Sequence, residues 1–190
     1  FPNLFEPMQV RHITFKNRIA SAPNCINSMS YGISNDYTIG YYEHKAKGGA
    51  AYVVISEIPV DEFGAHYKHP EISEEMSPVY GEMIAAIREN GAIPAVELTH
   101  AGHNSTIRFN KGGYAIGPVG YTRPDGVEVV EMDEELMNKV ADSFANAALY
   151  FKRLGIEMCV LHGGHNWLLS QFLSPLTNTR TDEYGGTAEN

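Results

Sequence analysis

The chain has 190 residues and a formal net charge of −9 at pH 7, and 43% of its residues are hydrophobic. This length and composition suffice to bury a core, so we expect one compact globular domain. The acidic balance leaves no basic stripe for nucleic acid or an anionic membrane, and no apolar run approaches the ~20 residues that cross a bilayer. Only two cysteines are present and the first residues do not resemble a signal peptide, so we expect a cytoplasmic protein.

The first part of the chain alternates apolar runs with a helical segment. Residues 8–15 are expected to form two short strand pieces, and residues 19–22 a first core strand that a proline ends. A helix over 38–47 precedes a second strand over 50–55, which is apolar on both faces as parallel strands are. We expect this strand to end at Ser56.

The next segment starts a helix at Ser77 and Pro78. Serine is a preferred N-cap and proline is favoured in the first turn, so the pair predicts the start of a helix that Asn90 ends. A third strand is expected over 92–98. Residues 104–131 are expected to form an irregular connection, and a loop of that length in a compact domain is typically functional, so we expect it to cover the substrate.

Two histidines follow the last strand of the chain. Asp133 is placed to cap a long amphipathic helix that ends at Gly155, and residues 156–161 form a short apolar strand. His162 and His165 come directly after it. Because ligands bind at the carboxyl ends of strands in parallel α/β proteins, the repeated strand and helix order predicts a parallel sheet with an active site here.

The polar run after this strand is long and specific. It contains His162, His165 and Trp167 and continues to Asn-x-Arg-x-Asp-x-Tyr-Gly-Gly over residues 178–186. This run resembles the signature of the Old Yellow Enzyme family, flavin-dependent NADH or NADPH oxidoreductases that include 2-enoate and 2,4-dienoyl-CoA reductases. Within the 178–186 segment we expect the four polar side chains to hold the loop rather than to take part in chemistry.

The resemblance implies a (β/α)8 TIM barrel, of which this chain covers about the first four βα units. A full barrel takes roughly 250 residues. Residues 1–190 would therefore be the N-terminal half of an FMN-binding TIM-barrel oxidoreductase domain. Larger members of the family append an iron–sulfur cluster and a second nucleotide-binding region, so such a cluster and FAD are conceivable further cofactors in the rest of the protein.

The resemblance also implies which residues bind the flavin. Pro23, Asn24 and Cys25 match the family's pattern at the end of the first strand, where one branch places a cysteine against the flavin; a small buried hydrophobic residue is the alternative for Cys25. Ser56 would lie at the end of the second strand. Glu97 stands where the family has a flavin-binding glutamine, and we expect its carboxyl group to be protonated or paired.

The implied reaction reduces a carbon–carbon double bond conjugated to a carbonyl or carboxylate. NADH or NADPH would reduce FMN, which gives hydride to the β carbon, while His162 and His165 bind the substrate oxygen. Many relatives have a proton-donating tyrosine where this chain has Trp167, whose indole N–H is no practical acid, so water, a histidine or a tyrosine such as Tyr31 must substitute. Asn27, where some relatives place a tyrosine, is a further substrate-binding candidate.

Three other functions stay open at this point. A metal-dependent TIM-barrel hydrolase could use His100, His103, His162 and His165, which all follow strand ends, although no carboxylate stands beside them and the family motif would be unexplained. A flavin-dependent amine demethylase and a flavin-binding electron carrier are the others. For the preferred function we expect no metal, a small unsaturated molecule as the partner, and no nucleic acid or membrane; a homo-oligomer is left open.

Overall fold

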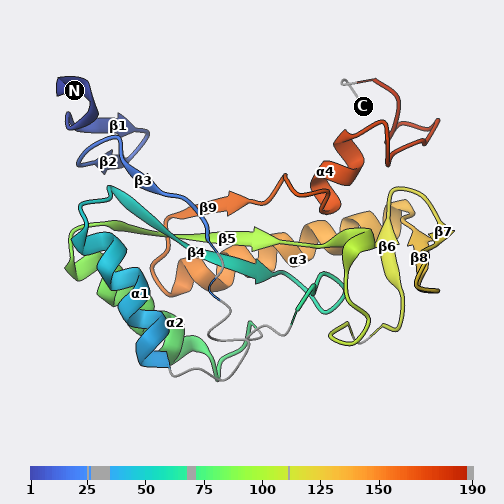
Figure 1. Cartoon of the computed structure of the whole chain (residues 1–190), viewed down its shortest axis with the longest axis horizontal. Coiled ribbons are helices and arrows are strands. Elements are labelled where there is room, and N and C mark those ends of the chain that lie inside the picture. The colour runs from blue at the N-terminus through green and yellow to red at the C-terminus, as the bar shows by residue number, and fades with distance from the viewer. Residues whose placement is uncertain (25, 27–34, 68–71, 111, 188–190) are drawn as a thin grey trace. The chain divides into compact units, whose positions relative to one another are not determined.

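The computed structural model describes residues 1–24, 26, 35–67, 72–110 and 112–187 (Figure 1). The strands are β1 (Met8–Val10), β2 (Ile13–Phe15), β3 (Ala20–Ser21), β4 (Tyr52–Pro59), β5 (Ile93–Thr99), β6 (Ala115–Gly117), β7 (Tyr121–Thr122), β8 (Glu128–Glu131) and β9 (Met158–Leu161). The helices are α1 (Asn35–Lys47), α2 (Ser77–Glu89), α3 (Glu134–Arg153) and α4 (Leu168–Leu173), with short 3-10 turns η1 (Pro2–Leu4) and η3 (Gly102–Asn104).

The largest sheet has the strand order β3-β4-β5-β9, which is also the order along the chain. Among the described residues, α1 lies between β3 and β4 in the sequence, α2 between β4 and β5, and α3 between β5 and β9. The β3–β4 pair is parallel, with Ala20 opposite Tyr52 and Ser21 opposite Val53. This is the repeated strand and helix order that the sequence predicts for a parallel α/β protein.

Helix starts differ in how well the sequence predicted them. The side chain of Asp133 caps α3, since its Oδ1 accepts the backbone N–H of Leu136 at 2.8 Å, as expected. The N-cap of α2 is Met76 rather than Ser77, and it makes no side-chain capping bond. Ser77 instead lies inside the helix, and its hydroxyl contacts the hydroxyl of Tyr150 at 2.9 Å. The predicted first-turn proline is present.

Two predictions about strand ends and loops were wrong. Strand β4 continues past Ser56 to Pro59, because Ile58 is again buried, and the strand passes through a positive φ of 75° at Glu57. Residues 104–131 are not an irregular connection. They contain a three-stranded sheet of order β6-β8-β7, in which β6 pairs with β8 in parallel and β7 pairs with β8 antiparallel.

The chain forms two compact units. The first unit comprises residues 1–58, 70–97 and 148–160, and the second unit comprises residues 59–69, 98–147 and 161–190. In the first unit α1 and α2 lie side by side (Figure 1). Its core includes Val53 and Ile55 of β4, the buried face of α2, and Phe151, whose ring meets that of Tyr80 edge-on at 5.0 Å.

The core of the second unit joins β6, the start of α3 and α4. Ile116, Met132, Val140 and Leu168 are buried in one cluster, against which further hydrophobic side chains pack. These partly buried neighbours are Phe63, Tyr114, Leu136, Met137, Phe144 and Phe172. The stripe along α3 that the sequence predicts contributes Val140 and Phe144 to this core.

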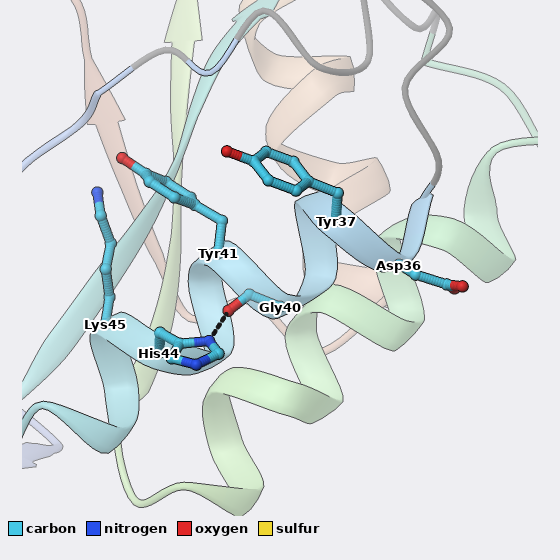
Figure 2. A pocket seen from close by; sticks show the side chains of 6 residues that line it. All are labelled: Asp36, Tyr37, Gly40, Tyr41, His44 and Lys45. Carbon is cyan, nitrogen blue, oxygen red and sulfur yellow. Dashed lines mark hydrogen bonds between the residues drawn. The ribbon is translucent and has the colours of Figure 1, made fainter.

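A shallow hollow lies along one face of α1, in the first unit (Figure 2). Tyr37, Tyr41 and Lys45 follow one another along the helix there, and Lys45 Nζ lies 4.4 Å from the centre of the Tyr41 ring. The ring nitrogen Nδ1 of His44 donates to the carbonyl of Gly40 at 2.6 Å. None of the predicted site residues lines this hollow. Within the described ranges, no helix is long and apolar enough to span a membrane.

Candidate active site

The two histidines after β9 form a close pair. Nδ1 of His165 lies 3.0 Å from Nε2 of His162, and the rings stack with their centres 4.9 Å apart and their planes 25° from parallel. The backbone N–H of His162 donates to the carbonyl of Leu98 at 3.0 Å, which ties the start of the segment to the end of β5. A nitrogen–nitrogen contact of this length needs one N–H donor and one lone pair, so the two rings share one hydrogen bond.

The backbone between the two rings is unusual. His165 and Asn166 have φ angles of 54° and 55°, in the left-handed region that residues other than glycine rarely adopt. The turn closes with the backbone N–H of Trp167 donating to the carbonyl of Gly164 at 3.0 Å, and α4 starts with the backbone N–H of Leu168 donating to the carbonyl of His100 at 2.9 Å. His165 is therefore brought back over His162 by a tight turn.

Trp167 is a wall of this site. The residue is 8% exposed, and its ring lies edge-on to that of His162 with the ring centres 4.7 Å apart. The centre of the His66 ring lies 5.9 Å from the centre of the same indole. Nδ1 of His66 donates to the carbonyl of Asn104 at 2.9 Å. The indole of Trp167 thus borders the pair, at the position for which the sequence indicates no practical proton donor.

His100 and His103 are buried and engaged in other bonds. Nδ1 of His100 accepts the backbone N–H of Gly102 at 3.0 Å, and its Nε2 lies 3.2 Å from Oδ1 of Asp61. His103 is 7% exposed, and its Nε2 lies 3.0 Å from the side-chain amide nitrogen of Asn166. Both histidines therefore shape the site rather than face a ligand.

These contacts argue against the metal-dependent hydrolase. Over the described part of the chain, no group of three or more His, Cys, Asp or Glu side chains is placed to hold a metal ion. Nδ1 of His100 accepts a backbone N–H and its Nε2 faces the Asp61 carboxylate, so both ring nitrogens are directed at protein groups. The four histidines considered as zinc ligands thus divide into one surface pair and two buried structural residues.

The predicted flavin-binding residues that the structure describes belong to the first unit. Pro23 is half-buried and Asn24 is exposed, both just after β3. The hydroxyl oxygen of Ser56 is shielded from solvent and has no hydrogen-bond partner among the described residues. Glu97 is 6% exposed within β5. Cys25 and Asn27 lie outside the described residues.

An unpaired buried hydroxyl is costly, so the Ser56 side chain fits a polar ligand that supplies the missing bond. A flavin ring, with its carbonyl oxygens and ring nitrogens, has the matching groups. The observed surroundings of Ser56 and the buried carboxyl group of Glu97 are thus compatible with an FMN site beside the C-terminal halves of β4 and β5.

The segment that resembles the family signature has a structural arrangement. Nη1 of Arg180 donates to the carbonyls of Pro118 at 2.8 Å and Met132 at 2.9 Å, and the guanidinium pairs with Asp182. The side-chain amide of Asn178 donates to the carbonyls of Phe172 and Tyr184. These bonds support the expected role of the segment in holding the loop.

Sequence reasoning missed Asp61, Gln171 and Arg123. Gln171 is fully buried, and its amide nitrogen donates to the carbonyls of Ala101 and Asn166 at 3.0 and 2.7 Å. Arg123 donates through Nη1 to the carbonyls of His103 and Ser105 at 3.1 and 2.8 Å. A glutamine on the apolar side of a short helix is a signal that could have identified Gln171 as a buried, hydrogen-bonded residue.

The strand order and the helices between the strands are those of a TIM barrel, of which the chain covers about the first four βα units. The model of the NADH:flavin oxidoreductase / NADH oxidase family matches residues 3–190, and the chain belongs to this family. The family consists of FMN-binding oxidoreductases, and NADPH dehydrogenases are among the relatives of this chain. The resemblance and the fold class predicted from the sequence are confirmed.

The relatives that this chain matches are longer than the chain. It is 30% identical to the NADPH dehydrogenase of Listeria welshimeri over 98% of the chain and 56% of that protein. The Old Yellow Enzyme of Pichia sp. AKU4542 superposes with a TM-score of 0.87 at 25% identity, over 99% of this chain and 53% of that one. Histamine dehydrogenase from Rhizobium sp. 4-9 superposes with a TM-score of 0.89 at 25% identity, over the whole of this chain and 30% of that one. The chain thus spans about half the length of the curated relatives it matches.

Proposed function

We propose that the protein is an FMN-dependent ene-reductase. Its substrate is a small molecule with a carbon–carbon double bond conjugated to a carbonyl or carboxylate, and residues 1–190 are the N-terminal half of its catalytic barrel domain. The observation that carries the proposal is the contact of 3.0 Å between His165 Nδ1 and His162 Nε2 at the end of β9, in a chain of this family.

The histidine pair can stabilise negative charge on the substrate oxygen. Whichever ring donates the shared hydrogen bond, one of the two outer ring nitrogens carries an N–H, and a proton added to the pair gives an N–H on both. Charge grows on the carbonyl or carboxylate oxygen as the β carbon accepts hydride. A donor aimed at that oxygen therefore stabilises the transition state more than the ground state, which accelerates the reaction.

Bound FMN, once reduced by NADH or NADPH, supplies the hydride. Pro23, Asn24, Ser56 and Glu97 are the described residues that we propose hold it, with Cys25 as a further candidate. The Ser56 hydroxyl would gain the bond that it lacks among the described residues. Glu97 would accept from a ring N–H through its carboxyl group.

The proton that the α carbon needs must come from a group other than Trp167. An indole N–H does not ionise in the accessible pH range, so the tryptophan serves as an apolar wall that excludes water from one side of the pair. We propose that solvent or a histidine supplies the proton. A solvent-derived proton would appear as deuterium at the α carbon when the reaction runs in heavy water.

The test uses the full-length protein. Flavin absorption that bleaches anaerobically with NADH or NADPH, and returns on adding one of a panel of α,β-unsaturated acids and ketones, would support the proposal. Replacement of His162 by Leu should lower kcat/KM by about a hundredfold, the usual loss for one oxyanion donor. Asp142→Asn, on the exposed face of α3, is the matched control and should leave kcat/KM unchanged.

Two results would contradict the proposal. A protein that binds flavin and is reoxidised by amines but by none of the unsaturated compounds would be an amine oxidoreductase. A colourless protein with stoichiometric metal would lack the chemistry altogether. In either case His162→Leu would not produce the selective loss of enone or enoate turnover.

A further inference from the structure

We propose that His103 and Asn166 are positioning residues for the histidine pair. Asn166 holds the left-handed turn that carries His165, and buried His103 holds Asn166. The inference rests on the proposed role of His162 and His165 in binding the substrate oxygen, and it adds two residues that act on the reaction through the pair.

The turn needs external support because its backbone is strained. His165 and Asn166 adopt successive left-handed φ angles of 54° and 55°. Asparagine reaches this region more easily than most residues, but two consecutive side-chain-bearing residues there persist only when the surroundings hold them. The contacts of Asn166 are therefore what decide where His165 stands.

Asn166 is held at both its backbone and its side chain. Its carbonyl accepts from the side-chain amides of Asn104 at 2.8 Å and Gln171 at 2.7 Å. Its own amide nitrogen Nδ2 lies 3.0 Å from Nε2 of His103. An amide nitrogen can only donate, so His103 accepts this bond through an unprotonated Nε2.

His103 is itself fixed in place. Its backbone N–H donates to Oε1 of the fully buried Gln171 at 3.1 Å, and its carbonyl accepts from Arg123 at 3.1 Å. The edge of its ring meets the Tyr121 ring at 5.9 Å. Burial and the nearby Arg123 charge lower the pKa of His103, which favours the neutral form that the bond to Asn166 requires.

The support therefore runs from His103 through the Asn166 side chain to the backbone of the adjoining His165, whose ring contacts His162. The bond of His165 to His162 tolerates only a few tenths of an ångström of displacement before it is lost. Loosening Asn166 should change the distance between the two rings and misalign the donor. A misplacement of about 1 Å can lower a rate about a hundredfold, so for a smaller displacement of the pair we expect about a tenfold loss.

The test compares four variants of the full-length FMN-bound protein. His103→Leu removes the acceptor but keeps the bulk, whereas His103→Gln keeps an acceptor for the Asn166 amide. Asn166→Gly removes the side chain but accepts a positive φ without strain, so it should fold even if the buried leucine variant does not. His103→Leu combined with Asn166→Gly completes a double-mutant cycle.

The expected result is that the two substitutions are coupled. With cyclohex-2-enone as the probe, His103→Leu and Asn166→Gly should each lower kcat/KM about tenfold, the double variant should lose no more than either, and His103→Gln should stay within about twofold of wild type. The imidazole 15N resonances of His162 and His165 should shift in both single variants. Tyr121→Phe keeps the ring beside His103 and should change neither readout.

Two outcomes would overturn the inference: unchanged imidazole resonances of the pair in Asn166→Gly, or losses in the two single variants that multiply in the double variant. The resonances are measured without turnover. If the wild-type protein reduces no unsaturated substrate, the proposed function fails, while the nitrogen resonances still decide whether His103 and Asn166 position the pair.

Discussion

The ring nitrogen Nε2 of His100 lies 3.2 Å from Oδ1 of Asp61, and the His100 side chain has no exposed surface. Because Nδ1 of His100 accepts the N–H of Gly102, the ring proton is on Nε2 and faces the carboxylate. Oδ1 of Asp61 also accepts the backbone N–H groups of Phe63 and Gly64 at 2.9 and 3.0 Å. This contact joins the loop after β4 to the end of β5 within the second unit.

From the contact between His100 and Asp61 we expect the effect of Asp61→Asn on stability to depend on pH. Burial raises the pKa of the Asp61 carboxyl, but the bonds from His100 and the two backbone N–H groups outweigh it, so the pKa is lowered. A lowered folded-state pKa stabilises the fold above the unfolded pKa, and this stability is lost as the pH falls through the folded value. Asp61→Asn should therefore lower the free energy of unfolding by about 1–3 kcal/mol at pH 7.

Urea unfolding of the full-length protein at pH 7, 5 and 3.5 checks this. The deficit of Asp61→Asn should shrink below about pH 4, where the carboxyl of the unfolded wild-type chain binds a proton before that of the folded chain does. Asp142→Asn, on the exposed face of α3, should show almost no deficit. A deficit of Asp61→Asn that stays constant from pH 7 to 3.5 would mean that charge is not the cause.

A second pH effect is expected at His103. Burial, followed by the Arg123 charge, lowers its pKa from the ordinary value. The unfolded chain then binds a proton near pH 6.5 while the folded chain does not, so stability is full above that pH and declines below it. Between pH 7 and 5 the wild type should lose more unfolding free energy than His103→Gln, by at most about 1.4 kcal/mol per pH unit. Parallel stability curves for the two proteins would refute the assignment.

A side chain at position 102 is expected to destabilise the fold. The φ of Gly102 is 60°, and a Cβ atom there would lie within 2.3 Å of Oε1 of Gln171, against the side chain that braces the histidine turn. Gly102→Ala combines backbone strain with a steric clash and should cost about 2–4 kcal/mol. Gly126→Ala is the matched control, because its φ is 84° but nothing lies within 4 Å of the added atom, so strain alone should cost about 1 kcal/mol. Equal losses in the two variants would show that the Gln171 side chain gives way.

The parts of the fold that follow local patterns were predictable from the sequence. The order of strands and helices, the cap at Asp133 and the position of His162 and His165 beyond β9 all depend on short segments with clear periodicity or capping chemistry. The α2 cap was misassigned because Ser77 has the favoured chemistry, although the helix begins one residue earlier than a serine cap would require.

The supports of the site could not be read from local patterns. Asp61 meets His100, and Gln171 meets Ala101, only because the fold brings distant segments together, and no spacing in the sequence encodes those contacts. The three short strands within 104–131 were missed because each holds only two to four residues, too few for an alternating pattern. The left-handed turn at His165 and Asn166 was missed because neither residue is glycine.

Substitution of Arg180 can show whether the 178–186 segment has a structural role. The Arg180 side chain is 8% exposed, and Nη1 donates to the carbonyls of Pro118 and Met132 while the guanidinium pairs with Asp182. Arg180→Lys keeps the charge but cannot make these bonds together, and should lower the free energy of unfolding by about 1–3 kcal/mol. Asp182→Asn should cost less, about 0–1 kcal/mol, because that partner is exposed to solvent.

Steady-state kinetics on the same two variants separate structure from chemistry. At a temperature where both are fully folded, kcat/KM for cyclohex-2-enone should stay within about threefold of the wild type, since Arg180 donates to carbonyls inside the second unit. A loss of tenfold or more in Arg180→Lys, without a matching loss in Asp182→Asn, would instead mean that the guanidinium itself takes part in the reaction.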